Sequence, residues 1–408
     1  MNLGANVPLE VENRPYTLIG KRETVIRKWS SLIIKGPRPE KRGGAEPPLS
    51  LSKFAVPFHC EVGSMKRVVV TADSHFPTKS DCGFAMIDVS NPFDPVVISR
   101  NRLPDHCGSF ASSNDALYCS IPGSFLIFDI SDPFLPKLIS RLKANGGCQI
   151  VISQKKGRVF IADWKNGVLV IDVSNSFEPK IIGRMGCNGD EKNTGEINPY
   201  GVSGLTIRDK LLFASIMDYD MLQNREALYV FDISKPGNPK WIARVNTFPC
   251  RGHGIVLKRN CVVIVGLRST MVIDISRPEE PAVISLIETP DRFGMNPWLS
   301  GDFLYVPEIV YEPNRRLAGL RIFDISNPLH LKCVSELLIP ARAATNVKVV
   351  GSLAYLACQC GIAIVDVSNP EKPVLLNLCS PCEVNRIAEG IEVIDYRDEV
   401  FKERERVS

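Results

Sequence analysis

The sequence predicts an all-β protein, a seven-bladed β-propeller of four-stranded blades. Seven times an apolar run ends in Asp-Ile/Val-Ser, and in most copies a proline follows two residues after the serine. The motif aspartates are Asp88, Asp129, Asp172, Asp232, Asp274, Asp324 and Asp366. Successive aspartates are 41, 43, 60, 42, 50 and 42 residues apart. A β-rich unit that recurs at about forty residues, too short to bury its own apolar face, is typical of a propeller blade.

Each repeat has room for four strands of five to seven residues. In the seventh repeat we expect strands at 345–350, 353–358, 362–367 and 374–378. In the fifth repeat we expect them at 254–257, 262–266, 271–275 and 282–286. These segments are rich in β-branched residues, which favour strands, and the repeat region has no helical periodicity of useful length.

The motif residues are expected to close a tight turn where the third strand ends. Asp and Ser side chains accept hydrogen bonds from backbone N–H groups one or two residues further on. The first proline stops the strand, and a second proline opens a fourth strand that fits the outer edge of a blade. Ser176 replaces the first proline in repeat three, and Leu331 replaces the second in repeat six. We therefore interpret the seven aspartates as structural turn residues on one rim.

Three of the strands that carry the motif resemble the LVIVD-repeat family. They read Leu169-Val-Ile-Asp172, Met271-Val-Ile-Asp274 and Ile362-Ala-Ile-Val-Asp366. The resemblance covers about residues 57–380 and implies a β-propeller, often in secreted or cell-surface proteins. It implies no family-wide reaction and offers no catalytic residues to carry over, so it leaves the function open.

Three regions follow from this pattern. Residues 1–56 are expected to form an N-terminal extension with a proline- and glycine-rich linker or strap. Residues 57–380 form the seven-repeat propeller, and residues 381–408 add a C-terminal strand and a charged tail. The closure of the ring stays open: a terminal strand completes the first or the last blade, or the seven units are each whole.

Composition indicates the compartment and excludes some partners. The net charge of +4 gives no strong nucleic-acid signal, and no apolar stretch is long enough to cross a bilayer. The start of the chain lacks the pattern of a secretory signal. Thirteen cysteines, without C-x-x-C pairs along the repeats, favour a reducing compartment. We therefore expect a cytoplasmic protein, with the cell surface, reached by a route not visible in the sequence, as the alternative.

Histidines and cysteines recur in the loops that lead into the first strand of a repeat. His59, His106 and His253, with Cys107, are candidate ligands for copper or zinc, which imidazole and thiolate suit. The competing interpretation has the cysteines as small buried apolar residues and the histidines lining a wet channel mouth.

Other polar residues at the same position are candidates for a small-ligand site at the channel mouth. They are Cys148, Tyr200, Arg251, Asn296, Arg342 and Asn346. Insertions at 218–220 and 311–316 fall between the second and third strands of their repeats, and matching insertions on one rim point to function.

The sequence best supports a non-catalytic binding or scaffold protein that presents its loop face to a protein partner. The alternative is a propeller enzyme with a metal or small-molecule site at the channel mouth. No G-x-S-x-G, Walker, H-E-x-x-H or G-x-G-x-x-G motif is present, so whether the chain is an enzyme stays open.

Overall fold

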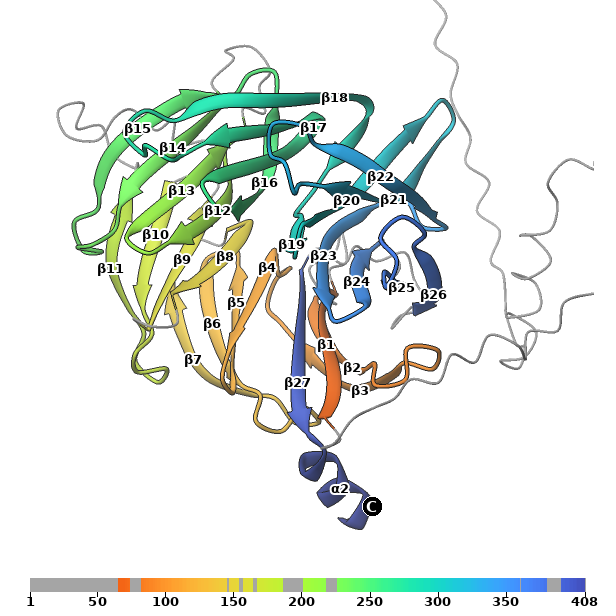
Figure 1. The fold of residues 1–408 in the computed structure, drawn as a ribbon. Helices are drawn as coiled ribbons and strands as arrows, with labels where there is room; N and C mark the ends of the chain where they lie inside the picture. The colour runs from red at the N-terminus through yellow and green to blue at the C-terminus, as the bar shows by residue number, and fades with distance from the viewer. Residues whose placement is uncertain are drawn as a thin grey trace, which may run out of the picture. The chain divides into compact units, whose positions relative to one another are not determined.

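Antiparallel β-strands dominate the computed structural model of the chain (Figure 1). The structure describes residues 65–73, 82–144, 147–153, 157–163, 167–185, 201–217, 226–359, 361–379 and 390–407. The N-terminal extension, His59, Tyr200 and the 218–220 insertion lie outside the described residues.

Within this part of the chain, five sheets have four strands each. In sheet order they are β27 (Ile391–Arg397), β1 (Met65–Asp73), β2 (Gly83–Asp88) and β3 (Val96–Arg102); β4 (Ser109–Ser113), β5 (Ala116–Ile121), β6 (Ser124–Asp129) and β7 (Lys137–Lys143); β8 (Gln149–Ser153), β9 (Arg158–Asp163), β10 (Gly167–Asp172) and β11 (Lys180–Met185); β12 (Val202–Arg208), β13 (Leu211–Ile216), β14 (Ala227–Asp232) and β15 (Lys240–Asn246); and β23 (Ala344–Val350), β24 (Leu353–Cys358), β25 (Gly361–Asp366) and β26 (Val374–Cys379). We name them blades one, two, three, four and seven.

The remaining described sheet has seven strands and contains two repeats. Its strands are β16 (Arg251–Lys258), β17 (Cys261–Asp274), β18 (Ala282–Gly294), β19 (Trp298–Ser300), β20 (Phe303–Glu312), β21 (Arg315–Asp324) and β22 (Lys332–Ile339). The first half of β17 pairs with β16 and its second half with β18. Between the halves the chain turns at Arg268, which has a φ of 63°. At the end of the second half, Ile275 N–H donates to Asn260 O at 2.8 Å, and in blade four Ile233 N–H donates to Lys210 O in the same way. We therefore assign β16–β18 as blade five, with β17 supplying two strands, and β19–β22 as blade six.

The apolar core divides among the spaces between consecutive blades. Seven clusters of buried residues occur in the described part, each built from two neighbouring blades. Successive side chains on a strand face opposite sides. Val68 and Val70 of β1 thus pack toward blade two, whereas Val69 packs toward blade seven. Both faces of each sheet are covered, which is why the third strands are apolar at nearly every position.

The C-terminal strand closes the ring. The sequence analysis left the closure open, and β27 pairs with β1 as the innermost strand of blade one (Figure 1). The Arg67 guanidinium donates to both Asp395 oxygens, at 2.7 and 3.2 Å. Tyr396 donates its hydroxyl proton to Ile130 O in blade two, at 2.9 Å. Helix α2 (Asp398–Val407), which the sequence analysis interpreted as a charged tail, buries Phe401 against this corner.

Each Asp-x-Ser motif closes the turn between the third and fourth strands of its blade. In all seven, the serine N–H donates to the aspartate Oδ1 at 2.7–2.9 Å. The turns also connect neighbouring blades: Ser99 donates to Pro133 O of blade two, and Asn377 of blade seven donates to Phe93 O of blade one. All seven motifs therefore lie on the rim opposite the loops that connect one blade to the next.

The all-β propeller predicted from the sequence is confirmed. The division of β16–β22 into blades five and six is our own assignment. Among the described residues, no helix is long and apolar enough to span a membrane.

Candidate functional site

A cavity of about 530 Å³ lies at the centre of the seven innermost strands. Charged and aromatic side chains gather on one side of its wall. On three consecutive strands of blades six, seven and one, Trp298, Lys348 and Glu392 line it together. Lys348 Nζ lies 4.3 Å above the Trp298 ring and 3.3 Å from Glu392 Oε2. The predicted channel residues Asn296 and Asn346 also line this cavity, and a parallel bridge between them joins the segment before β19 to β23.

His253 lies on β16, in blade five. It is the bulged residue of β16, since Gly252 and Gly254 pair with consecutive residues of β17. Its Nδ1 is buried and has no hydrogen-bond partner among the described residues, and its ring packs edge-on against Phe293 at 5.6 Å. Burial lowers the pKa of His253 to about 4, while Asn296 opposes that shift. The imidazole is therefore neutral at pH 7.

The structure does not bring the other predicted metal ligands to His253. The ring of His106 is half exposed, with Nδ1 3.1 Å from Asp105 Oδ1. Cys107 is buried, with its Sγ 2.7 Å from the Sγ of Cys119. Across the described residues no three His, Cys, Asp or Glu side chains gather as a metal site.

His59 lies outside the described residues, so its place relative to these histidines stays a prediction. The innermost strand of blade one is β27, from the end of the chain. Cys148 lies just before β8, half buried, and donates its N–H to Ala162 O. Arg342 is exposed between β22 and β23.

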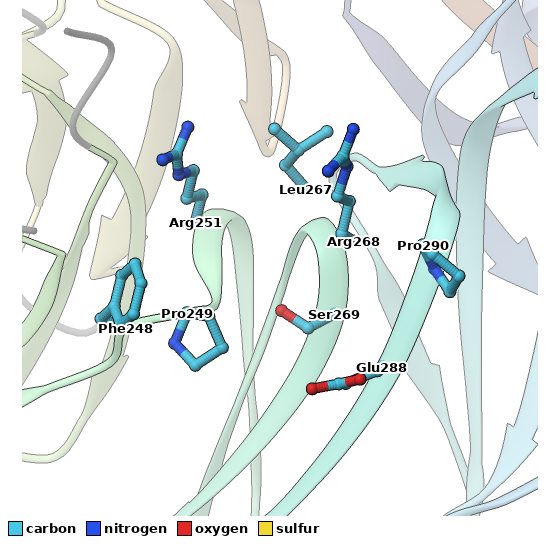
Figure 2. Close-up of a pocket in the computed structure, with 8 residues that line it drawn as sticks. All are labelled: Phe248, Pro249, Arg251, Leu267, Arg268, Ser269, Glu288 and Pro290. Atoms are coloured by element: carbon cyan, nitrogen blue, oxygen red, sulfur yellow. The ribbon is translucent and has the colours of Figure 1, made fainter. Parts of the chain in front are cut away.

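A second pocket, of about 440 Å³, opens on the loop face of blade five (Figure 2). Three segments form it: the loop from β15 to β16, the turn inside β17, and the end of β18. The lining residues are Phe248, Pro249, Arg251, Leu267, Arg268, Ser269, Glu288 and Pro290. The Arg251 and Arg268 side chains extend in the same direction with Leu267 between them. Phe248, which is 47% exposed, forms an apolar wall.

The two arginines have different electrostatic partners. Arg251 Nε lies 3.3 Å from Oε1 of Glu226, whose side chain is buried. Arg268 is exposed and has no hydrogen bond or ion pair within the part of the chain that the structure describes. Its φ of 63° directs the turn outward at the pocket rim. One guanidinium is thus held by an internal carboxylate, and the other is free to accept an external anion.

The nucleophiles near this pocket are not activated. Cys250 is fully buried, and desolvation raises the pKa of its thiol to about 12. The Ser269 hydroxyl is buried without a hydrogen-bond partner among the described residues, so no base is in place to accept its proton. Nucleophilic catalysis needs a base within hydrogen-bond reach. The arrangement is therefore suited to binding an anionic group beside an apolar one.

Sequence analysis found only Arg251 of this pocket. Arg268, Phe248 and Glu288 were missed, because their convergence depends on the tight turn inside β17. The available signals were Gly266 before the turn and an arginine next to a serine.

The family comparison agrees with the repeat seen in the strands. The family model of the LVIVD repeat matches residues 152–186, 294–337 and 341–380. The chain contains LVIVD repeats. The matched segments cover most of blades three and six and all of blade seven, and the hydrogen-bonded Asp-x-Ser turns extend the same pattern to the other blades. No curated protein matches the chain in sequence.

Solved structures share the fold at low identity. A proposed 6-phosphogluconolactonase from Bacteroides uniformis is 12% identical, with a TM-score of 0.63 over 80% of this chain and 99% of that one. Sqt1 from Chaetomium thermophilum, bound to the N-terminus of a ribosomal protein, is 11% identical, with a TM-score of 0.53 over 81% and 93%. The β-propeller domain of Swd1 from Myceliophteria thermophila is 10% identical, with a TM-score of 0.51 over 68% and 87%. These likenesses show the propeller fold of this LVIVD-repeat chain and nothing of its ligand.

Proposed function

We propose that this LVIVD-repeat propeller is a non-catalytic binding protein, and that its partner is a protein that places an acidic side chain against Arg251 and Arg268. The observation that carries the proposal is the unpaired guanidinium of Arg268 beside Arg251 at the rim of the blade-five pocket. Arginine and aromatic side chains at the edge of a concave site are the residue types that dominate protein–protein hot spots.

The other groups of the pocket define the rest of the partner's chemistry. Phe248 offers apolar surface next to the arginines, and Glu288 on β18 is available to accept a hydrogen bond. Glu226 already neutralises part of the charge on Arg251, so a single carboxylate suits the pocket better than a dense cluster of negative charge. A polypeptide segment with one Asp or Glu next to an apolar side chain fits this pattern.

A defined peptide library tests the proposal. Random twelve-residue peptides are displayed on phage, selected on the purified wild-type protein, and titrated as synthetic peptides. We expect the selected sequences to share an Asp or Glu next to an apolar residue. Arg268→Ala should weaken their binding roughly tenfold or more, because a hydrogen bond to a charged group contributes about 1.5–3 kcal/mol.

Arg342→Ala is the matched control, since Arg342 is also exposed near the loop face but lies outside the pocket. Equal losses in the two variants, or selected peptides without acidic residues, would refute the acidic-segment pocket.

A second candidate function is capture of a small polar molecule in the central cavity. The observation that favours it is the Trp298, Lys348 and Glu392 group on three consecutive strands. A ligand with a carboxylate and an ammonium group, such as a free amino acid, would contact Lys348 and Glu392 at once. Thermal shift with a panel of the twenty amino acids tests this, and a rise that disappears in Lys348→Met supports it.

A further inference from the structure

Two cysteines of blade two place their sulfur atoms against one another. Cys107 lies just before β4, and Cys119 lies on β5, the next strand of the sheet. Both side chains are fully buried, and the two Sγ atoms are 2.7 Å apart without being bonded. A disulfide bond is about 2.05 Å long, so an approach of less than one ångström would join them.

We propose that Cys107 and Cys119 form an oxidative modification site, at which a small peroxide converts the thiol pair to a disulfide. One thiol attacks a peroxide oxygen, gives up two electrons to the O–O bond, and becomes a sulfenic acid with release of one water. The second thiol attacks that sulfur and displaces the hydroxyl as a second water. Two thiols and one hydrogen peroxide thus give one disulfide and two waters.

The surroundings direct the reaction to this product. The pair lies in the apolar cluster between blades one and two, beside Phe110 and Leu117. A molecule as large as glutathione has no room there, whereas the second thiol is already in contact. Contact of this kind makes the second step effectively unimolecular. Burial, and then the neighbouring Cys107, raise the pKa of Cys119, so the reaction is expected to be slow at pH 7 and faster at alkaline pH.

The bond would fix a segment of the loop face. Cys107 follows His106, whose ring is half exposed, and the Sγ of Cys107 also contacts Ser109 O at 3.2 Å. The disulfide would close a short loop between positions that differ by 12 in sequence and would tie this segment to β5. Restricting the unfolded chain in this way raises stability.

The test uses the full chain, reduced and desalted, then treated with hydrogen peroxide. Remaining thiols are alkylated with N-ethylmaleimide after denaturation, and the protein is digested without reduction for mass spectrometry. We expect a cross-linked peptide pair joining Cys107 to Cys119, and a melting temperature about 4 °C higher than that of the reduced protein. Cys333 is exposed on β22, so its oxidation reports that the oxidant dose was sufficient.

Cys119→Ala serves as the control variant, and its melting temperature should not rise with peroxide. If this variant does not fold, the peptide map of the wild-type protein decides alone. Recovery of both cysteines as alkylated thiols, at a dose that oxidises Cys333, would overturn the proposal.

Discussion

One carboxylate, repeated seven times, organises the turn rim of this propeller. Each motif aspartate accepts the N–H of the serine two residues on, and in blade five the Ser276 hydroxyl also reaches Asp274 Oδ2 at 3.1 Å. Hydrogen bonds from the serines lower the pKa of Asp129, Asp172, Asp232 and Asp324. Because identical residues on seven blades stay apart around the rim, their chemistry is that of turns rather than of a shared active site.

Removing one of these side chains should have a local cost. Asp274→Ala loses both hydrogen bonds to Ser276, and we expect the free energy of unfolding to fall by about 1 kcal/mol. Asp274→Asn keeps a side-chain oxygen for the Ser276 N–H and should lose less. Urea denaturation of both variants checks this, and an unchanged midpoint for Asp274→Ala would argue against the capping role.

His253 should make stability depend on pH above the range in which aspartates titrate. Its pKa is about 4 in the folded protein and about 6.5 in an unfolded chain. Protonation of His253 is therefore less favourable in the folded state than in the unfolded chain. The stability that the neutral ring contributes is present above pH 6.5 and is lost as the pH falls toward 4. Between pH 7 and pH 5 the loss should be on the order of 2 kcal/mol.

His253→Leu removes the titrating ring and should flatten this part of the stability profile. Thermal unfolding in buffers between pH 7 and pH 5 makes the comparison. Parallel profiles for the variant and the wild-type protein would show that His253 is not the group responsible.

At the scale of the element, the fourth strands share a β-bulge that protects the outer edge of each blade from pairing with another strand. In every blade the pairing of the third and fourth strands contains a β-bulge, as between Met86 and Ile87 of β2. A bulge twists an edge strand away from further pairing, and the proline before the strand has no N–H to offer. The sequence indicated the prolines but not the bulges, because a bulge is visible only in the register of the pairing.

The closing strand β27 should contribute far more to stability than the helix that follows it. A chain ending at Gly390 would leave β1 as an open edge and expose the core between blades one and seven, to which Ile391 belongs. We expect this variant to aggregate or to unfold without cooperativity. A chain ending at Arg397 loses only α2, and with it about 2 kcal/mol from the burial of Phe401.

Calorimetry and size-exclusion chromatography of the two truncated chains separate these expectations. If both keep the melting temperature of the full chain, β27 is not the closing strand that its pairing indicates.

Over the whole molecule, repetition made the propeller predictable and the individual sites unpredictable. The strands of the seventh repeat follow from spacing and turn chemistry, and β23–β26 lie within one or two residues of the expected positions. The pairing of β27 with β1 was one of three closures that the sequence left open, since the contact joins residues far apart in sequence, such as Arg67 and Asp395.

The blade-five pocket depends on residues at which blade five differs from the other blades. Arg268 has its role because the turn inside β17 is shorter than the corresponding hairpins of blades four and six, and because φ is positive there. The repeat spacing shows the longer insertions of blades four and six, but the positive φ at Arg268 cannot be recognised from it. Arg251, by contrast, occupies the recurrent position at the start of the innermost strand and was predicted from it.

A charge-reversal titration tests the central claim, that the blade-five pocket binds an acidic side chain, most directly. The wild-type protein and Arg268→Glu are titrated with a selected peptide and with its copy in which the acidic residue is lysine. We predict that the wild-type protein prefers the acidic peptide and that Arg268→Glu reverses the preference. If Arg268→Glu binds both peptides as the wild-type protein does, Arg268 does not contact the acidic residue, and the account of this pocket is contradicted.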